Sequence, residues 1–206
     1  MPDLYRGGDF DLAGFCVGVV EREGILDGSA IAPGDTVLGL ASTGLHSNGY
    51  SLARKVVFDI AGLRPGDHVE ELGATVGEAM LRPTRIYVRP VRSVLRYYTV
   101  KNVVHGIAHI TGGGLLENLE RIVPEGAQVV IDRGSWPVPP IFSWIQRLGE
   151  IDQAEMDRVF NMGIGLVLVV SPFYPESIRH QLARSRIESW PIGRVQEGPR
   201  GVVWGQ

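Results

Sequence analysis

The sequence predicts an α/β fold, in the α+β sense, in which helices cover a mixed β-sheet. Strand-like and helix-like segments alternate after about residue 30, the pattern of a sheet packed against helices. Glycine-rich turns join a strand to a helix at two places, and 206 residues with 44% hydrophobic side chains suffice to build a buried core. These observations favour one generous domain accompanied by a piece of another.

The first 30 residues look like the end of a different unit. Residues 12–21, LAGFCVGVVE, have strand periodicity, with Phe15, Val17 and Val19 on one face. Cys16 lies inside this apolar run, so we expect a buried structural thiol and no nucleophile. The turn-rich stretch REGILDGSAIAPG follows and indicates a domain boundary near residue 30, dividing the chain into 1–30 and 31–206.

The second unit begins with a strand followed by a helix. TVLGLAS at 36–42 has strand composition, and a helix is expected over 48–61 because its apolar residues recur every four positions. Those residues are Leu52, Val56 and Ile60. Ser47 or Asn48 is available as the N-cap of this helix. The glycines at 62 and 66 end it.

The middle of the chain repeats the two signals. A helical region is predicted over 75–98, interrupted near Pro83, and Pro90 indicates a further helix start or a kink. VVHGIAHI at 103–110 reads as a strand, TGGG at 111–114 as a sharp turn, and LLENLERIV as the helix that follows directly.

The last third continues with segments whose prolines and aliphatic runs set the boundaries. We expect strands at 128–132 and 165–170, helices at 139–149 and 171–186 that start at prolines, and a final hairpin or strand pair formed by WPIGRV and GVVWG.

Composition excludes several classes of protein. The formal net charge is -3 and the arginines are scattered, so no electrostatic footprint for nucleic acid is present. No apolar run reaches the roughly 18 residues of a membrane span, and one cysteine permits neither an internal disulfide nor a cysteine-based zinc site. We therefore expect a soluble, cytoplasmic protein without a membrane or nucleic-acid partner.

The TGGG turn is the first candidate site. Glycines permit positive φ and the close approach of a ligand, and the start of the following helix presents free N–H groups that suit a phosphate. A tight turn that needs glycine only for packing explains the same spacing equally well. The turn is neither a Walker loop nor a GxGxxG fingerprint.

The loop STGLHSNGYS at 42–51 is the second candidate. Ser47 and Asn48 alone are more often helix caps than ligands. His46 adds a group that transfers a proton or neutralises a phosphoryl oxygen near neutral pH, although a structural loop histidine is the commoner case. No GxSxG elbow accompanies it, so a Ser-His-Asp hydrolase is not indicated.

Three further features are weaker. His105 and His109 share one strand face but lack a carboxylate in their segment, so we predict no metal site there. His109 directly precedes ITGGG and is expected to line the same cleft as that turn. Asn161, Gly163 and Gly165 indicate a backbone that passes close to a ligand or to a neighbouring helix.

Five segments of the chain, taken in order, point to one known family: DFDLAGFCVGVVE, GDTVLGLASTGLHSNGYSLARKV, LRPTRIYV, IAHITGGGLLENLERIVP and FNMGIGLVLVV. Together they strongly resemble aminoimidazole ribonucleotide synthetase, also called phosphoribosylformylglycinamidine cyclo-ligase. The resemblance covers nearly the whole chain. It implies a purine-biosynthesis enzyme that uses ATP, assisted by Mg²⁺, to close the imidazole ring of formylglycinamidine ribonucleotide. Phosphoryl transfer needs mainly positioning and charge stabilisation, which such motifs supply.

The resemblance also implies residue roles. His46 would assist phosphoryl transfer, Ser47 and Asn48 would shape that pocket, and Thr111 with Gly112, Gly113 and Gly114 would hold the substrate, plausibly its ribose phosphate.

Members of that family extend further before the position of Met1. By resemblance, this extension carries the nucleotide loop, the aspartates that hold Mg²⁺ and most of the sheet that forms a homodimer. The chain would be a complete C-terminal synthetase domain preceded by a leftover strand of the N-terminal domain, inactive by itself. The alternative is a non-catalytic phosphate-binding or assembly module, or a truncated remnant, that needs a separate N-terminal half.

Overall fold

A mixed six-stranded sheet forms the centre of the molecule and confirms the predicted fold class. The computed structural model describes residues 14–205. The strand order is β4-β6-β1-β7-β5-β8, and only β5 and β8 run parallel. The strands are β1 Thr36–Ala41, β4 Val104–His109, β5 Ala127–Ile131, β6 Ile164–Val170, β7 Ser189–Glu197 and β8 Gly201–Trp204.

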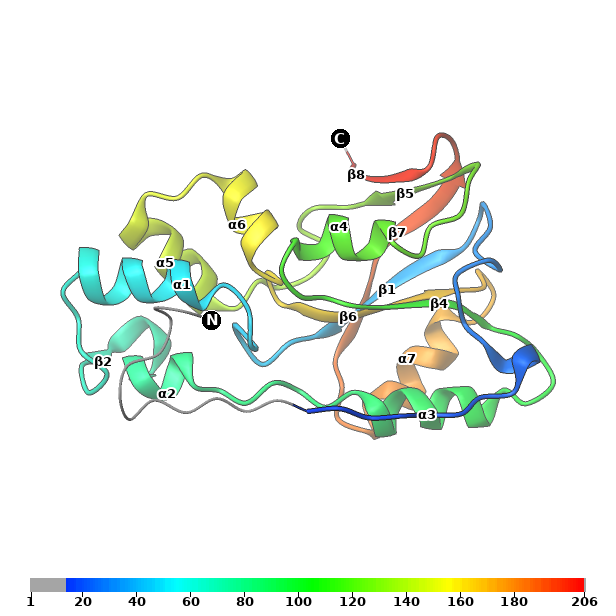
Figure 1. Cartoon of the computed structure of the whole chain (residues 1–206), viewed down its shortest axis with the longest axis horizontal. Coiled ribbons are helices and arrows are strands. Elements are labelled where there is room, and N and C mark those ends of the chain that lie inside the picture. Colours follow the sequence, from blue (N-terminus) through cyan, green and yellow to red (C-terminus); the bar gives the residue numbers. More distant parts are fainter. Residues whose placement is uncertain (1–13, 206) are drawn as a thin grey trace.

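Helices lie on both faces of this sheet. Figure 1 shows α4 on one side and α3 with α7 on the other, while α1, α2 and α5 form a lobe beyond one end. The helices are α1 Tyr50–Arg54, α2 Val76–Met80, α3 Val88–Tyr97, α4 Gly114–Glu120, α5 Pro140–Gly149, α6 Gln153–Val159 and α7 Pro175–Arg184. Shorter elements are the 3-10 turns η1 Arg22–Gly24 and η3 Glu70–Leu72, the π-helix η2 Lys55–Ile60 and the small strands β2 His68–Val69 and β3 Ala74–Thr75.

The central strand β6 shows why both faces are covered. All seven of its residues are buried. Val167 and Val169 pack in the apolar cluster beneath α4, whereas Leu168 and Val170 pack in the cluster beneath α3 and α7. A strand buried on both faces has continuous aliphatic residues rather than alternation, which is the pattern of GLVLVV.

The predicted final hairpin is wrong. β7 and β8 do not pair with each other, because β5 runs between them and pairs with β7 on one side and with β8 on the other. The turn at 198–200 therefore carries the chain across β5 to its free edge. Sequence patterns identify strands but not their neighbours.

The predicted helix at 48–61 also differs in detail. Its N-cap is Gly49 in the left-handed conformation, and neither Ser47 nor Asn48 caps it. α1 passes into the π-helix η2, whose wider turn shifts the apolar face, so that Ile60 is 57% exposed while Val57 is buried. The helical region from residue 75 divides into α2 and α3, with Pro90 in the first turn of α3, where its missing N–H removes no helical hydrogen bond.

The predicted strand at 12–21 is absent from its described part, residues 14–21, which has no strand partner among the described residues. Phe15, Val17 and Val19 are 94%, 80% and 98% exposed, and Cys16 is exposed, which corrects the expectation of a buried thiol. A strand forms only where a neighbour accepts its hydrogen bonds. The boundary near residue 30 stays a prediction.

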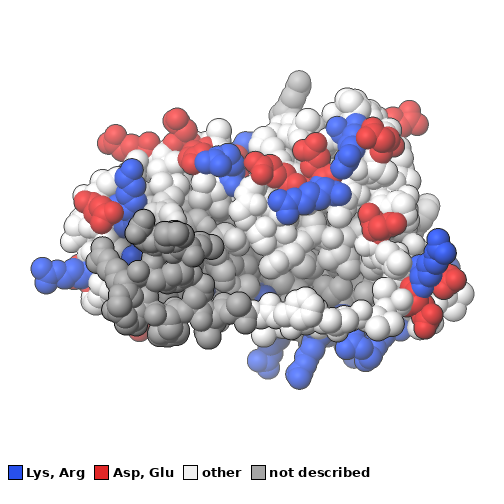
Figure 2. Space-filling view, in the orientation of Figure 1, with Lys and Arg blue, Asp and Glu red and all other residues white. Residues whose placement is uncertain are grey.

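Charged side chains of both signs are distributed over the face shown in Figure 2. The arginines of α3, Arg89, Arg92 and Arg96, are exposed, and basic side chains project where Figure 1 places this helix. Within residues 14–205, no helix is both long and apolar enough to cross a membrane.

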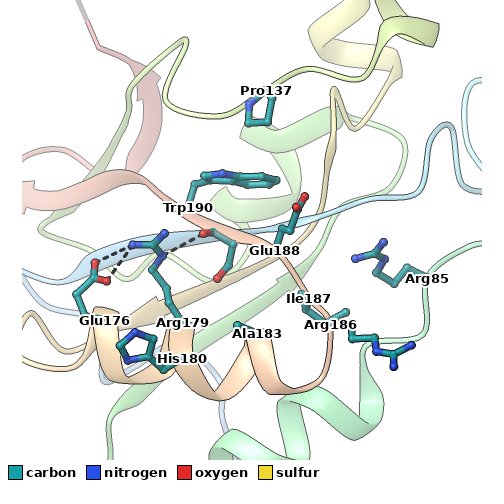
Figure 3. A pocket seen from close by; sticks show the side chains of 11 residues that line it. Arg85, Pro137, Glu176, Arg179, His180, Ala183, Arg186, Ile187, Glu188 and Trp190 are labelled. Atoms are coloured by element: carbon teal, nitrogen blue, oxygen red, sulfur yellow. Dashed lines mark hydrogen bonds and ion pairs between the residues drawn. The ribbon is translucent and has the colours of Figure 1, made fainter. Parts of the chain in front are cut away.

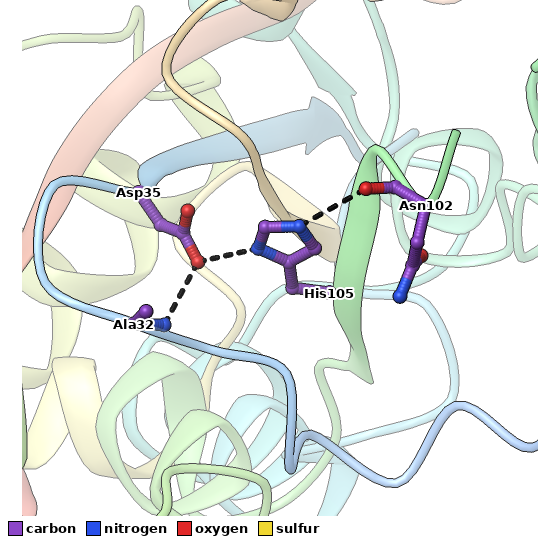
Figure 4. A network of polar contacts seen from close by, with 4 residues as sticks. All are labelled: Ala32, Asp35, Asn102 and His105. Carbon is purple, nitrogen blue, oxygen red and sulfur yellow. Dashed lines mark hydrogen bonds and ion pairs between the residues drawn. The ribbon is translucent and has the colours of Figure 1, made fainter.

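A buried carboxylate ties the start of β1 to β4, although β6 lies between these strands. Asp35 Oδ2 accepts hydrogen bonds from the Ala32 N–H at 3.0 Å and from His105 Nδ1 at 2.7 Å (Figure 4). His105 Nε2 lies 3.2 Å from the carbonyl oxygen of Asn102. The carboxylate partner of His105 thus comes from outside its own segment.

We expect Asp35→Ala to lower the free energy of unfolding by roughly 1–3 kcal/mol, because it leaves the Ala32 N–H and the His105 ring without their buried acceptor. Urea unfolding monitored by circular dichroism measures this loss. The matched control is Asp59→Ala, at an exposed position that makes no side-chain hydrogen bond within the described part of the chain. Equal midpoints for both variants would contradict the structural role of Asp35.

Candidate functional site

The loop at 42–49, which follows β1, is buried at Ser42 and from Gly44 to His46, and it is held by the side chain of Asn161. Asn161 Nδ2 donates to the carbonyl oxygens of Gly44 at 2.8 Å and Leu45 at 3.2 Å, and its Oδ1 accepts from the Gly163 N–H at 2.8 Å. This clamp joins residues more than 110 positions apart. It explains the VFNMG motif, in which the sequence indicated a close backbone approach without identifying its neighbour.

His46 is 3% exposed and has a φ of 58°, in the left-handed region. Its Nε2 accepts the N–H groups of Thr43 at 3.0 Å and Arg85 at 3.4 Å. An acceptor Nε2 requires the neutral ring with its proton on Nδ1, and Nδ1 is buried without a hydrogen-bond partner in the described residues. Burial is the largest of the effects that lower the pKa of His46 to about 4, and the neighbouring His109 and Arg85 contribute to the same shift.

Tyr87 packs against this histidine, with ring centroids 6.2 Å apart. Its hydroxyl donates to the carbonyl oxygen of Ala41 at 2.8 Å, and burial raises the pKa of Tyr87. A Cβ on Gly165 would lie 2.1 Å from the Tyr87 hydroxyl and 2.5 Å from His46 Cε1, so only glycine fits there. Sequence reasoning missed Tyr87, whose only signal was its place in LRPTRIYV.

Hydroxyl groups join the loop to the segment before α3. Thr43 Oγ1 donates to the carbonyl oxygen of Pro83 at 2.6 Å, and Ser47 Oγ lies 3.0 Å from Thr84 Oγ1. Asn48 is half-buried and makes no side-chain hydrogen bond among residues 14–205. Together with the Arg85 N–H on His46, these contacts make the loop and the segment at 83–87 one continuous wall.

The TGGG turn is built around Asn118. Asn118 Nδ2 donates to the carbonyl oxygens of Gly114 at 2.7 Å and of Thr111 and Gly112 at 3.2 Å, while Thr111 Oγ1 donates to Asn118 Oδ1 at 3.0 Å. This one amide fixes the turn from inside, a role not predicted from the sequence.

The three glycines of the turn meet different constraints. Gly113 and Gly114 have φ values of 96° and 62°, and a Cβ on Gly114 would lie 1.7 Å from the carbonyl oxygen of Asp157. A Cβ on Gly113 would meet the Glu117 carboxylate. Gly112 has neither a positive φ nor any atom within 4 Å of such a Cβ. Packing therefore accounts for Gly113 and Gly114 but gives no steric reason for Gly112.

The loop at 42–49 and the TGGG turn do not line the same hollow. Thr43 and Gly44 of the loop line a small one of about 40 Å³, together with Pro139 and Ile141. Tyr87 and His109 line a hollow of about 440 Å³ on the α3 side, and Gly113 with Glu117 lines one of about 300 Å³ beside α6. None of these hollows is lined by residues of both motifs. The helices α3 and α4, beside which two of the hollows lie, are on opposite sides of the sheet (Figure 1). His109 therefore lies beside Tyr87, with ring centroids 6.3 Å apart, and not in the hollow of the TGGG turn as the sequence predicted.

The described residues do not provide a metal centre. Within 14–205, no three His, Cys, Asp or Glu side chains lie close enough together to hold a metal ion.

Comparison with known proteins gives a consistent result. Residues 32–206 match the family described as AIR synthase related protein, C-terminal domain. The chain is 52% identical over 203 residues to the phosphoribosylformylglycinamidine cyclo-ligase of Pseudothermotoga lettingae and 51% identical over 205 residues to that of Syntrophus aciditrophicus. Each match covers 98% of this chain but 58% of the relative, so the chain spans little more than half their length.

Solved structures share the fold at low identity. Thiamine-monophosphate kinase from Stenotrophomonas maltophilia aligns with 90% of this chain and 54% of its own, with a TM-score of 0.57 and 16% identity. E. coli HypE, a hydrogenase maturation protein, aligns with 87% of this chain and 48% of its own, with a TM-score of 0.53 and 18% identity.

The neutral state of His46 predicts a pH-dependent stability. Between pH 6.5 and about pH 4 the unfolded chain binds a proton on His46 that the folded chain does not, so the free energy of unfolding falls as the pH falls through this window. The contribution of neutral His46 to the free energy of unfolding is fully present above pH 6.5. Below about pH 4 this contribution has been lost, and the loss is on the order of 3 kcal/mol. Urea unfolding at several pH values in this range measures it.

A His46→Asn variant should lose this part of the pH dependence, whereas His68→Asn, at an exposed histidine, should keep it. If wild type and His46→Asn showed the same slope of stability against pH, the neutral buried state of His46 would be refuted.

Proposed function

The chain belongs to the family of AIR synthase related proteins, whose C-terminal domain it contains, and we propose that it supplies the C-terminal half of a phosphoribosylformylglycinamidine cyclo-ligase of purine biosynthesis. In this reaction ATP phosphorylates the formyl amide oxygen of formylglycinamidine ribonucleotide. The amidine nitrogen then attacks the activated carbon, the ring closes, and ADP and phosphate leave. The observation that carries the proposal is the sequence identity of 51–52% to two such enzymes over 98% of the chain.

We assign the substrate's ribose phosphate to the TGGG turn. Gly112 supports this assignment, because it is exposed and no packing contact accounts for the absence of a side chain. The Gly112 N–H has no hydrogen-bond partner among the described residues and would donate to the phosphate. The Thr111 hydroxyl and the N–H groups of Gly113 and Gly114 already donate within the protein, to Asn118, Arg158 and Thr111. The Glu117 carboxylate lies over Gly113, so the phosphate would approach from the side of Thr111 and Gly112 unless Glu117 moves.

His46 is proposed to assist phosphoryl transfer by holding the wall at 42–49 and 83–87 in place. Its Nε2 already accepts two backbone N–H groups and its ring stays neutral, so proton transfer from a protonated imidazole is disfavoured. Ser47 and Asn48 would form the polar surface of this wall. A direct contact between His46 and a reacting oxygen would have to use the Nδ1 proton, after a movement that exposes it.

ATP is the proposed co-substrate, and Mg²⁺ the metal expected to screen its phosphates. The described residues contain no cluster of ligands that fits Mg²⁺, so no step is assigned to the ion here. Its ligands, and the surfaces that form a homodimer, are proposed to lie in the part of the relatives that this chain does not match. Residues 1–30 would then be the end of the domain that contains that part, and the whole protein would work in the cytoplasm.

The first experiment tests the phosphate assignment in a chimera in which this chain replaces the matching segment of the Pseudothermotoga lettingae relative. Gly112→Asp places a negative charge in the turn without a steric clash, so the KM for the ribonucleotide should rise by at least about tenfold. Gly112→Ala adds a methyl group without charge and is the matched neutral comparison, so its KM should rise less than that of Gly112→Asp. An unchanged KM for Gly112→Asp would count against the turn as the phosphate site.

The second experiment compares the 206-residue chain alone with that chimera. The chain alone should give no detectable aminoimidazole ribonucleotide with ATP and Mg²⁺, since it lacks the remaining length of its relatives and exposes the apolar Phe15, Val17 and Val19. The chimera should turn over. Comparable activity of the isolated chain would overturn the proposal that it supplies half of a site.

A further inference from the structure

A hollow of about 790 Å³ lies beside the first residues of β7, between α7 and Pro137 (Figure 3). It exists because β5 pairs with β7 only from Gly193 onwards. The preceding residues of β7 have β1 on one side and no strand on the other. The hollow is separate from those beside Tyr87 and beside the TGGG turn, although Arg85 borders two of them.

At one end of the hollow the arginine is paired with a carboxylate. Arg179 Nη1 lies 2.8 Å and 3.0 Å from the two carboxylate oxygens of Glu176, and its Nε donates to the carbonyl oxygen of Ser189 at 3.0 Å. Figure 3 shows this pair at the end opposite to Arg85 and Arg186. Glu176 offsets the charge of this guanidinium, and only its Nη2 lacks a hydrogen-bond partner among the described residues.

The other end carries two arginines without carboxylate partners. Arg85 enters from the segment before α3 and Arg186 from the turn after α7, and neither forms a salt bridge in the described part of the chain. Arginine forks bind phosphate through pairs of parallel hydrogen bonds. Two uncompensated guanidinium groups from different elements at one end of a hollow are therefore suited to a phosphate.

Glu188 and Trp190 line the middle of the hollow, next to the two arginines (Figure 3). Glu188 is exposed and forms no salt bridge with any described residue. Its carboxylate repels a phosphate but accepts hydrogen bonds from hydroxyl groups, as acidic residues do from ribose. The half-buried indole of Trp190 offers an aromatic face to a planar base.

We propose that this hollow binds a ribonucleoside 5′-phosphate. The phosphate contacts Arg85 and Arg186, the ribose hydroxyls donate to Glu188, and the base packs on Trp190. The order of these groups along the hollow matches the order phosphate, sugar, base, and the volume lies within the roughly 300–1,000 Å³ of small-molecule sites. The proposal does not depend on the cyclo-ligase assignment.

Isothermal titration of the 206-residue chain with AMP tests the proposal. We expect saturable binding with one site per chain and a Kd of about 1 mM or tighter. Arg186→Ala and Arg85→Ala should each weaken binding by at least about tenfold, because each removes a charged phosphate contact. Arg184→Ala, an exposed arginine on α7 outside the hollow, is the matched control and should leave the Kd unchanged.

Further ligands and variants identify each contact. Inorganic phosphate and adenosine should each bind more weakly than AMP, and Glu188→Gln should reduce the preference for AMP over its 2′,3′-dideoxy analogue. Trp190→Ala should weaken AMP but not inorganic phosphate. Gly112→Asp should leave AMP binding unchanged, which separates this hollow from the TGGG turn. The absence of saturable AMP binding, or binding that is insensitive to both arginine substitutions, would overturn the proposal.

Discussion

The middle of the loop after β1 is buried, and the rest of the site depends on how the backbone polar groups of this loop find partners. Buried N–H and C=O groups without partners cost free energy, so a loop beneath the surface must be hydrogen-bonded throughout. Asn161 satisfies the carbonyl groups of Gly44 and Leu45, and His46 satisfies two N–H groups. These contacts link β1, β6 and the segment before α3, so that chemistry at this end of the sheet rests on a rigid wall.

The TGGG turn uses the same principle with different residues. Asn118 binds three carbonyl groups of the turn, as Asn161 binds two of its loop. Asn118 lies on α4 itself, whereas Asn161 comes from the segment between α6 and β6. Both motifs are thus preorganised by a buried asparagine, and both contact the segment at 157–161, through Asn161 for the loop and through the carbonyl oxygen of Arg158 for the turn.

Sequence patterns predicted the elements well where local physics decides them. The aliphatic run of β6, the prolines that start α5 and α7, and the glycine turn before α4 are local signals. The pairing of β5 between β7 and β8 could not be predicted, because it depends on long-range neighbours. In the site, loop composition indicated His46 and Asn161, but the Tyr87 contact with Ala41 joins residues 46 positions apart and leaves no local pattern.

The burial of β1 has a consequence for synthesis of the chain. β1 is an early strand, yet its two neighbours are β6 and β7, with Thr36 paired to Val170 and to Arg194. At roughly 5–20 residues per second, a ribosome makes β1 on the order of ten seconds before either neighbour emerges. During that interval both apolar faces of β1 are unprotected, so the nascent chain is expected to need a chaperone, and the sheet closes only after β7 has been made.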